Sequence, residues 1–430
     1  MVRPAMPFRF VHTADLHLDS PLRSLALRNA ELAGLVRSAT RDALVRIVDL
    51  CIAESVDALL IAGDLYDGSQ TSMNTALFLA AELRRLDEAG IRTFIIRGNH
   101  DSQSQVTREL TLPSSVHVFA GRSRAVHVKT LANGRTVHIH GVSFADPHAP
   151  ESLLPQFHPP VAGGINIGML HTSLSGSAAH DPYAPCSVAE LQRHGFDYWA
   201  LGHVHQRQVH CEKPCIVMPG MPQGRDINEA GTKGVTIVTV DDEGLVALDD
   251  RPTGTAAFER HEIDVSGIAD WRDMLDAVGR ELIHLRKNMA ADNLILRLTL
   301  TGATPLAWRL RRDADLLEAE IVNIAAGIGG CWIEKTELGC QAIGNAEQSA
   351  ADPVGELAAL VENDVLPSFG FRGELSGVAK ELLQQLPPEL RQVLASDEEA
   401  LERLALEAAL AGSADVLAHL HGRAGAGGID

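Results

Sequence analysis

The sequence predicts an α/β fold in which two sheets pack as an α/β sandwich, and three observations support this. Short β-rich runs alternate with stretches of helical periodicity through the first half of the chain. Their β-α-β-α-β order favours a largely parallel sheet with helices outside it. Further strand runs continue to about residue 250. A second, more antiparallel sheet is therefore expected to pack on the first.

The elements follow in order along the chain. Strands are expected at 8–15, 57–64 and 91–101, with helices at 39–56 and 72–90 between them. Asn133 and Gly134 separate two alternating segments, a pattern typical of a β-hairpin. The remaining strands are expected in "GGINIGMLHTSL", "FDYWALGHVH", "KPCIVMPG" and "KGVTIVTVDDEGLVAL".

Beyond residue 250 the sequence predicts smaller parts. A strand-helix-strand-helix-strand pattern is enough for a small α+β capping domain, with helices at 269–289 and around 305–325 between "FERHEIDV", "NLILRLTLTG" and "CWIEKTEL". A linker and then short amphipathic helices with acidic starts follow, and the chain ends in a flexible tail. The expected boundaries are 1–250, 258–340, 341–352, 353–422 and 423–430.

Composition limits the classes of protein that fit. A length of 430 residues with 45% hydrophobic residues suits two or three globular domains. No apolar run is long enough to span a membrane, no secretory signal is recognisable, and six cysteines are too sparse for a disulfide scaffold, so a cytoplasmic location is expected.

The net charge of the chain is −19. Residues 1–250 hold 21 Lys+Arg against 27 Asp+Glu (−6), and residues 251–430 hold 16 against 29 (−13). This acidity argues against indiscriminate nucleic-acid binding.

Five polar clusters stand where strands should end. They are "TADLHLD" with Asp15 and His17, "AGDLYDG" with Asp64 and Asp67, "RGNHDS" with Asn99, His100 and Asp101, "MLHTSL" with His171, and "LGHVHQ" with His203 and His205. Sites in open α/β folds gather beyond the carboxyl ends of strands. The five clusters are therefore expected to share one rim.

The residue types in these clusters favour metal binding. Imidazole, carboxylate and amide ligands without thiolate suit manganese, iron or zinc. About seven ligands are too many for one ion and about right for two, an arrangement that suits phosphoester hydrolysis. Each cluster alone has an ordinary alternative, since Asp15 could cap a turn and His171 could be a core histidine. Three further histidines lack a neighbouring carboxylate cluster and are interpreted as structural: His127, His138 and His140.

In combination and in this order, Asp-x-His, Gly-Asp, Gly-Asn-His-Asp, His and Gly-His-x-His resemble the calcineurin-like metallophosphoesterase family, over residues 8 to about 240. The stretches "FVHTADLHLDSPL", "AGDLYDG", "LHTSLSG", "LGHVHQRQ" and "PGMPQGRDINEAGTKG" are similar to its DNA repair exonuclease branch related to Mre11 and SbcD. Within that branch the likeness is to the bacterial subgroup typified by YhaO.

The resemblance implies a role for each site residue. Asp15, His17 and His205 would bind one divalent ion, Asn99, His171 and His203 a second, and Asp64 would bridge them. His203 and His205 are two positions apart on an extended segment, so both can face one site. His100 would stabilise or protonate the leaving oxygen, with Asp67 orienting it, unless Asp67 is only a turn residue before Gly68. Arg225 would touch a substrate phosphate, unless it is an ordinary surface arginine.

The same resemblance implies an activity and partners. The expected enzyme is a two-metal DNA exonuclease or endonuclease that uses Mn²⁺, the nuclease subunit of a repair complex with a Rad50- or SbcC-like coiled-coil ATPase. Residues 353–422 would dock that ATPase or simply pack on their own protein, and a homodimer is expected through helices of the first domain. Two alternatives remain open, a phosphatase or small-molecule phosphodiesterase and a non-catalytic scaffold, although "GDLYDGS" lacks the arginine of phosphoprotein phosphatases and no ligand is missing.

Overall fold

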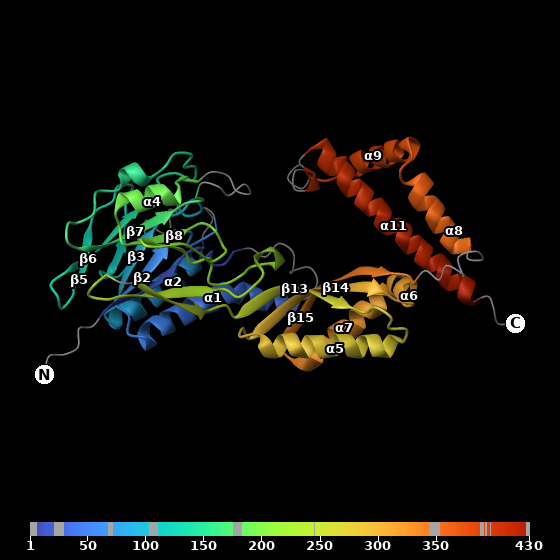
Figure 1. The fold of residues 1–430 in the computed structure, drawn as a ribbon, viewed down its shortest axis with the longest axis horizontal. Helices are drawn as coiled ribbons and strands as arrows, with labels where there is room; N and C mark the ends of the chain where they lie inside the picture. The colour runs from blue at the N-terminus through green and yellow to red at the C-terminus, as the bar shows by residue number, and fades with distance from the viewer. Residues whose placement is uncertain are drawn as a thin grey trace. The chain divides into compact units, whose positions relative to one another are not determined.

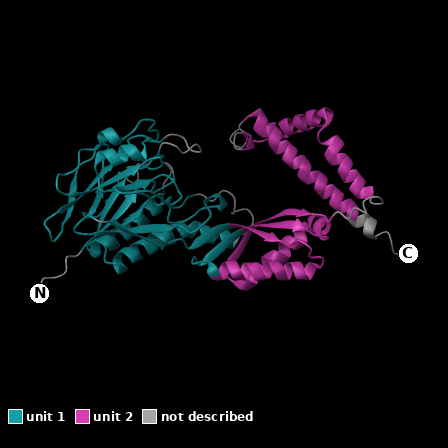
Figure 2. Ribbon diagram, in the orientation of Figure 1, with its two compact units in different colours: residues 1–259, 288–296 teal, residues 260–287, 297–430 magenta. Residues whose placement is uncertain are grey.

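The computed structural model describes residues 7–20, 30–67, 72–102, 111–174, 183–244, 246–343, 353–387, 391, 394, 395 and 397–426 (Figure 1). The chain forms two compact units (Figure 2). Unit 1 holds residues 1–259 and 288–296, and unit 2 holds residues 260–287 and 297–430.

The first sheet of unit 1 has the strand order β12-β11-β1-β2-β3-β4. Its strands are β1 (Phe8–Thr13), β2 (Ala58–Ala62), β3 (Arg92–Ile96), β4 (Val116–Val118), β11 (Gly234–Val240) and β12 (Val246–Pro252). β1 to β4 are parallel, and β11 and β12 add antiparallel strands at one edge. The helices α1 (Ala30–Ala53) and α2 (Met73–Glu88) connect β1 to β2 and β2 to β3. They cover the outer face, where Ile47 and Leu83 pack with Leu59.

The second sheet has the strand order β5-β6-β7-β8-β10-β9. Its strands are β5 (Val126–Thr130), β6 (Thr136–Val142), β7 (Ile165–His171), β8 (Tyr198–Gly202), β9 (Gln208–Glu212) and β10 (Cys215–Met218). The predicted hairpin is present, because β5 and β6 pair antiparallel around Gly134, whose φ is +87°. The helix α4 (Val188–His194) packs Leu191 on the outer face of this sheet beside Trp199.

The expectation of a more antiparallel second sheet is wrong. Within the described residues, each sheet has three parallel and two antiparallel strand pairs. Parallel neighbours need a long crossover connection. Residues 143–164 supply one between β6 and β7, and the segment with α4 supplies the next between β7 and β8. The sequence pattern showed these strands but not the direction in which the chain returns.

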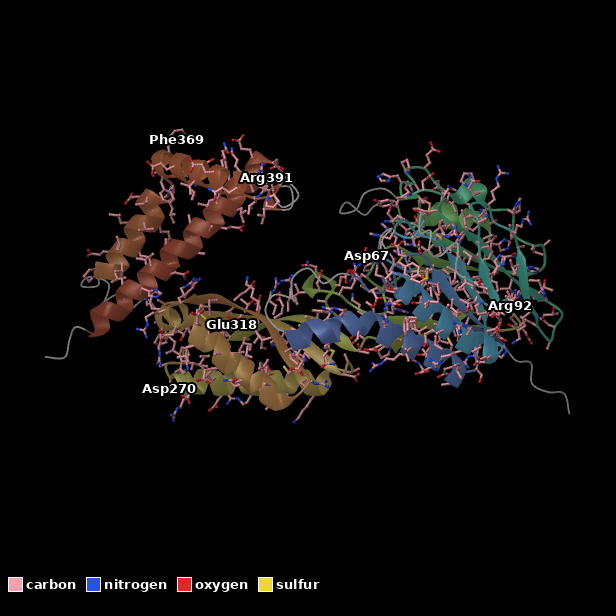
Figure 3. The ribbon with its side chains drawn as sticks, turned by 180° about the vertical axis from the view of Figure 1, so that it is seen from behind. Asp67, Arg92, Asp270, Glu318, Phe369 and Arg391 are labelled. Carbon is pink, nitrogen blue, oxygen red and sulfur yellow. The ribbon has the colours of Figure 1, made fainter. Side chains whose placement is uncertain are left out.

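A core between the two sheets holds the sandwich together. Alternate side chains of each sheet meet there, including Phe10, Leu60 and Phe94 from the first sheet and Ile139 and Ile167 from the second. The predicted α/β sandwich is thus confirmed. Arg92, at the amino end of β3, and Asp67, beyond the carboxyl end of β2, lie on opposite sides of the sandwich (Figure 3). The carboxyl ends of the parallel strands therefore share one edge.

Unit 2 contains the larger part of a three-stranded sheet, together with helices. The sheet has the order β13-β14-β15, with β13 (Ala256–Asp264), β14 (Asn293–Ala303) and β15 (Cys331–Gln341). The helices α5 (Trp271–Asn288) and α7 (Ala314–Ile328) lie side by side against it, and α6 (Ala307–Arg312) precedes α7 (Figure 1). α5 buries Met274, Val278 and Leu282, which are four residues apart and so share one helix face.

The C-terminal helical region is α8 (Pro353–Leu360), a π-helical turn at Val361–Val365, α9 (Phe369–Gln384) and α11 (Glu398–Ala426). α11 has 29 residues, so the expectation of only short helices is wrong here. It also includes 423–426, which were expected to belong to the tail, and residues 427–430 lie outside the described part. Residues 344–352 of the expected linker lie outside it too. Among the described helices, none is both long and apolar enough to cross a membrane.

Candidate metal centre

The ends of five strands bring the predicted clusters to one edge of the sandwich. Asp15 and His17 follow β1, Asp64 follows β2, Asn99 follows β3, His171 ends β7, and His203 and His205 follow β8. Backbone hydrogen bonds join neighbouring loops, with the N–H of Asp15 donating to the carbonyl of Gly63 at 3.0 Å and that of His17 to Asp64 at 3.1 Å. Residues far apart in sequence thereby become neighbours.

The backbone at this edge is strained and tightly packed. Asp15, His17, Asp64 and His203 all have positive φ, a conformation that costs energy for residues other than glycine and is concentrated at functional sites. A Cβ at Gly98 would lie 2.2 Å from Oδ1 of Asp64. The loops therefore need glycine where they pass beneath the clustered side chains.

Asp15, His17 and His205 form the first group of potential ligands, with atoms that all lie within 4.8 Å of one another. The Nε2 atoms of His17 and His205 are 3.1 Å apart. Nδ1 of His205 lies 2.8 Å from Oε1 of Glu229. Because a carboxylate accepts hydrogen bonds, we assign the proton of neutral His205 to Nδ1, which directs the lone pair of Nε2 into the group.

Asp15, Asp64 and His171 form a second, overlapping group. Nδ1 of His171 donates to the carbonyl of Ala62 at 2.9 Å, so in the neutral ring the Nε2 lone pair faces Oδ1 of Asn99 at 3.0 Å and Oδ2 of Asp64 at 3.4 Å. Three acceptors facing one another repel unless a proton or a metal ion lies between them.

His203 lies beside both groups. Its backbone N–H donates to Oδ2 of Asp15 at 3.0 Å. Its ring lies 5.1 Å from the ring of His171, measured between centroids. The structure thus brings all seven sequence-predicted ligands to one edge.

Burial and mutual proximity shift the pKa values of this cluster strongly. Burial raises the pKa of Asp15 to about 6 and lowers that of His17 to about 3. Burial opposes the charged form of His171, but the Asp64 carboxylate beside it raises its pKa to about 9. The pKa of Asp64 is held below its usual range by His171, against the effect of burial.

The residues fit divalent cations. Asp15, His17 and His171 are at most 1% exposed, and buried carboxylates and imidazole lone pairs need a positive partner. Nδ1 of His17 has no hydrogen-bond partner within the described residues. The mixed nitrogen and oxygen donors are those of manganese, iron or zinc sites.

His100 and Asp67 form a pair at the rim of the cluster. Nδ1 of His100 lies 3.2 Å from Oδ1 of Asp67, and this contact raises the pKa of His100 and holds that of Asp67 below its usual range. The other oxygen of Asp67 accepts from Ser20 at 2.6 Å and lies 3.7 Å from Nη1 of Arg225. The imidazole of His100 is 41% exposed, so a substrate can reach it. Gly68, which would complete the alternative turn, lies outside the described residues.

Two acidic residues of this edge were not assigned from the sequence. Glu229 ends a short 3₁₀ turn (Ile227–Glu229) and holds both His205 and Arg225, whose Nε is 3.1 Å from its Oε2. Asp101 is fully buried and accepts from the backbone N–H groups of Leu65 and Gly98 at 2.9 and 2.6 Å. Asp101 was visible beside His100 in its cluster, whereas Glu229 belongs to no metal-ligand spacing.

Comparison with known proteins gives two family matches. Residues 8–207 match the calcineurin-like phosphoesterase family, and residues 258–341 match the middle domain of metallophosphoesterase YhaO.

Individual relatives agree with these matches. The chain is 32% identical over 310 residues to the uncharacterized metallophosphoesterase YhaO of Bacillus subtilis, covering 72% of this chain and 75% of that protein. It is 25% identical over 354 residues to the DNA double-strand break repair protein Mre11 of Methanopyrus kandleri, covering 76% and 70%. Among solved structures, a dimetal phosphatase from Danio rerio matches with a TM-score of 0.36 at 13% identity, covering 57% and 97%.

Proposed function

Because this chain belongs to the calcineurin-like metallophosphoesterase family, as its motifs indicated, we propose that it is a DNA nuclease that hydrolyses phosphodiester bonds with two divalent ions, Mn²⁺ being the expected metal. The observation that carries the proposal is the pair of overlapping ligand groups, which share Asp15 at one edge of the sandwich. DNA as the substrate is supported by the similarity to proteins named as Mre11.

Seven residues would hold the two ions. Asp15, His17 and His205 would bind one, Asn99, His171 and His203 the other, and Asp64, which lies within reach of both histidine sets, would bridge them. When bound, such ions polarise a phosphoryl oxygen and make water a strong nucleophile at neutral pH. The hydrogen bonds of His205 to Glu229 and of His171 to Ala62 fix the rings with Nε2 toward the site.

His100 would assist the leaving group. Its contact with Asp67 favours the charged imidazole, which can donate a proton or a hydrogen bond to the departing oxygen. Ser20 and Arg225 hold the far oxygen of Asp67 and so fix the orientation of the pair. Arg225 has one further candidate role, a contact to a substrate phosphate, although Glu229 already balances its charge.

We extend the proposal to the domain organisation and the partners of a cytoplasmic repair enzyme. Residues 1–250 would be the nuclease domain and 258–340 a cap, with a homodimer formed through helices of the nuclease domain. Residues 353–422 would dock a Rad50- or SbcC-like ATPase. Phe369, labelled on α9 in Figure 3, is 94% exposed, and Leu360 and Leu410 are about half exposed, whereas Leu401 is buried within unit 2. Loss of ATPase capture in a Phe369→Ser variant, with unchanged nuclease activity, is the expected result.

The test of the proposal compares wild type with His100→Ala on two substrates in Mn²⁺. Single- and double-stranded DNA have a poor alkoxide leaving group, whereas bis(p-nitrophenyl) phosphate has a good one that needs no proton. We expect DNA cleavage by wild type and a loss of about 100- to 10,000-fold in His100→Ala, as is typical of removing a general acid. Turnover of the small ester should fall far less.

Other outcomes would contradict specific parts of the proposed function. Turnover of the small ester without DNA cleavage by wild type would favour the alternative phosphatase or small-molecule phosphodiesterase. Equal DNA cleavage by wild type and His100→Ala would remove His100 from the chemistry. Absence of any turnover in a metal-loaded protein would favour the non-catalytic scaffold.

A further inference from the structure

A cavity of unit 1 adjoins the candidate metal centre at His205. It has a volume of about 280 Å³ and four segments line it. These are 205–207 after β8, 219–221 after β10, 230–234 leading into β11, and the end of β12 at Asp250 and Pro252. None of the roles assigned above uses this cavity except through His205.

Backbone forms much of the cavity wall. Gly220 has a φ of +73°, and a Cβ there would lie 2.8 Å from the backbone nitrogen of Arg207. A Cβ at Gly234 would lie 2.2 Å from the carbonyl of Arg251. These two positions admit no side chain, and Arg207, Lys233 and Asp250 supply charged side chains to the lining.

The charges of these three side chains do not cancel. Nε of Arg207 lies 3.0 Å from Oδ1 of Asp250, so these two balance each other. Lys233 is half-buried, and within the described residues it has no carboxylate within the 4.0 Å of an ion pair. Its Nζ donates only one long hydrogen bond, 3.4 Å to the carbonyl of His205. An ammonium has three donors, so two remain for a ligand.

The half-buried ammonium of Lys233 loses hydration that no close anion replaces. Glu229 and Glu259 act on it only at longer range. Although the chain has a net charge of −19, an unpaired lysine ammonium beside the candidate metal centre is suited to binding an anion. The anion that a nuclease encounters there is a phosphate of its substrate.

We propose that this cavity is a subsite for a second phosphate of the substrate strand, held by Lys233 beside the phosphodiester at the metal centre. The inference rests on the proposed function and refines its substrate class, from any phosphodiester to one that carries a neighbouring phosphate. A DNA strand has one phosphate per nucleotide, so the nucleotide next to the scissile bond supplies the second phosphate. Small diesters with a single phosphate leave the cavity unused.

The experiment compares three short substrates in Mn²⁺: thymidylyl-thymidine with a single internal phosphate, and the same molecule with one added 5′ or 3′ phosphate. For wild type, we expect one of the two additions to raise kcat/KM about tenfold, the effect of one hydrogen bond to a charged group. In Lys233→Met, which keeps an apolar stem, that gain should disappear, so that the phosphorylated and unphosphorylated molecules have the same kcat/KM.

Lys213→Met is the matched control. Lys213 is exposed in the turn between β9 and β10, at the opposite end of β10 from the cavity, and its substitution removes the same charge. This variant should keep the gain. Retention of the gain in Lys233→Met, or its absence in wild type with both additions, would overturn the inference while the proposed function stands.

A binding measurement decides the case in which wild type hydrolyses none of these short molecules. The affinity for a labelled single-stranded oligonucleotide is measured by anisotropy at several salt concentrations. The slope of log K against log salt should be about 0.7 smaller in Lys233→Met than in wild type or Lys213→Met, because one phosphate contact is lost. Equal slopes in all three proteins would overturn the inference.

Discussion

Two histidines of unit 1, His12 and His171, have the same burial and opposite chemistry. Both are fully buried. His12 bonds through Nδ1 to the hydroxyl of Tyr198 at 2.9 Å and through Nε2 to the carbonyl of Leu201 at 3.0 Å, and burial lowers its pKa to about 3. His171 bonds a carbonyl through Nδ1, but its Nε2 faces Asn99 and Asp64, and its pKa is raised to about 9.

The difference lies in what the second ring nitrogen meets. Neutral His12 donates from Nε2 and accepts the hydroxyl proton of Tyr198 at Nδ1, so the protein satisfies both nitrogens. The second nitrogen of His171 meets other acceptors, an arrangement that a cation resolves. If His171 binds metal as proposed, burial alone does not separate a ligand histidine from a structural one, whereas the partner of the second nitrogen does.

The largest effect is expected from substituting the two rings in turn. His171→Asn should lose bound metal and reduce hydrolysis of a small diester by about a thousandfold or more, because metal ions supply several kcal/mol of transition-state stabilisation. His12→Gln should keep its metal and its rate while losing stability. Metal content of dialysed protein and steady-state rates are the measurements. Equal metal loss in both variants would show that His171 does not bind metal differently from His12.

A smaller effect is expected at Glu229, which orients His205 through a hydrogen bond. Glu229→Gln keeps the shape of the side chain but weakens the hydrogen bond to Nδ1, and loss of such a partner typically costs 10- to 100-fold in metal affinity. Titration of the protein with Mn²⁺ measures it.

Glu190→Gln is the matched control for this effect. Glu190 belongs to the capping box of α4, so its substitution removes the same charge from an exposed helix end. Its Mn²⁺ affinity should equal that of wild type. If both variants bind Mn²⁺ as wild type does, Glu229 has no positioning role.

The sequence predicted the fold and the proximity of the candidate ligands, because the position of each residue after a strand can be recognised locally. Parallel strands place their following loops at one edge, so the order of Asp15, Asp64, Asn99 and His171 along the chain was sufficient to group them. His12 shows the limit of this reasoning, because it lies only three residues before Asp15 and nothing in "FVHTAD" says that its ring meets Tyr198.

What the sequence could not show depends on the path of the chain in space. Glu229 reaches His205 through the segment between β10 and β11, and no spacing rule links residues 24 apart on different loops. The strands β4 and β9 were missed because β4 has only three residues and β9 only two apolar ones, Val209 and Cys211, too few for their alternation to be recognised. No sequence pattern distinguishes Lys233, because the cavity that it lines forms only when segments distant in sequence come together in the fold.

The pH dependence of stability tests whether His12 is buried in its neutral form. The pKa of His12 is about 3 in the folded protein against 6.5 when exposed, so the unfolded state binds a proton first as pH falls. Its neutral burial therefore favours folding fully above pH 6.5, and this contribution is lost as pH falls from 6.5 towards 3. By pH 5 the loss is about 2 kcal/mol. Denaturant unfolding in a chelator should show a drop in stability between pH 7.5 and pH 5 that is smaller by this amount in His12→Gln than in wild type. Equal drops would show that His12 is not buried neutral.

The smallest effect is expected at His127, an exposed histidine. It is exposed on β5, and Nε2 lies 3.1 Å from the hydroxyl of Thr130, which is also exposed. Water can replace this hydrogen bond, so His127→Ala should change the free energy of unfolding by no more than about 0.5 kcal/mol and leave metal content unchanged. Denaturant unfolding and metal analysis check both. A loss of metal here would mean that the hairpin histidines also bind ions, and the partner of the second nitrogen would then no longer separate the two kinds of histidine.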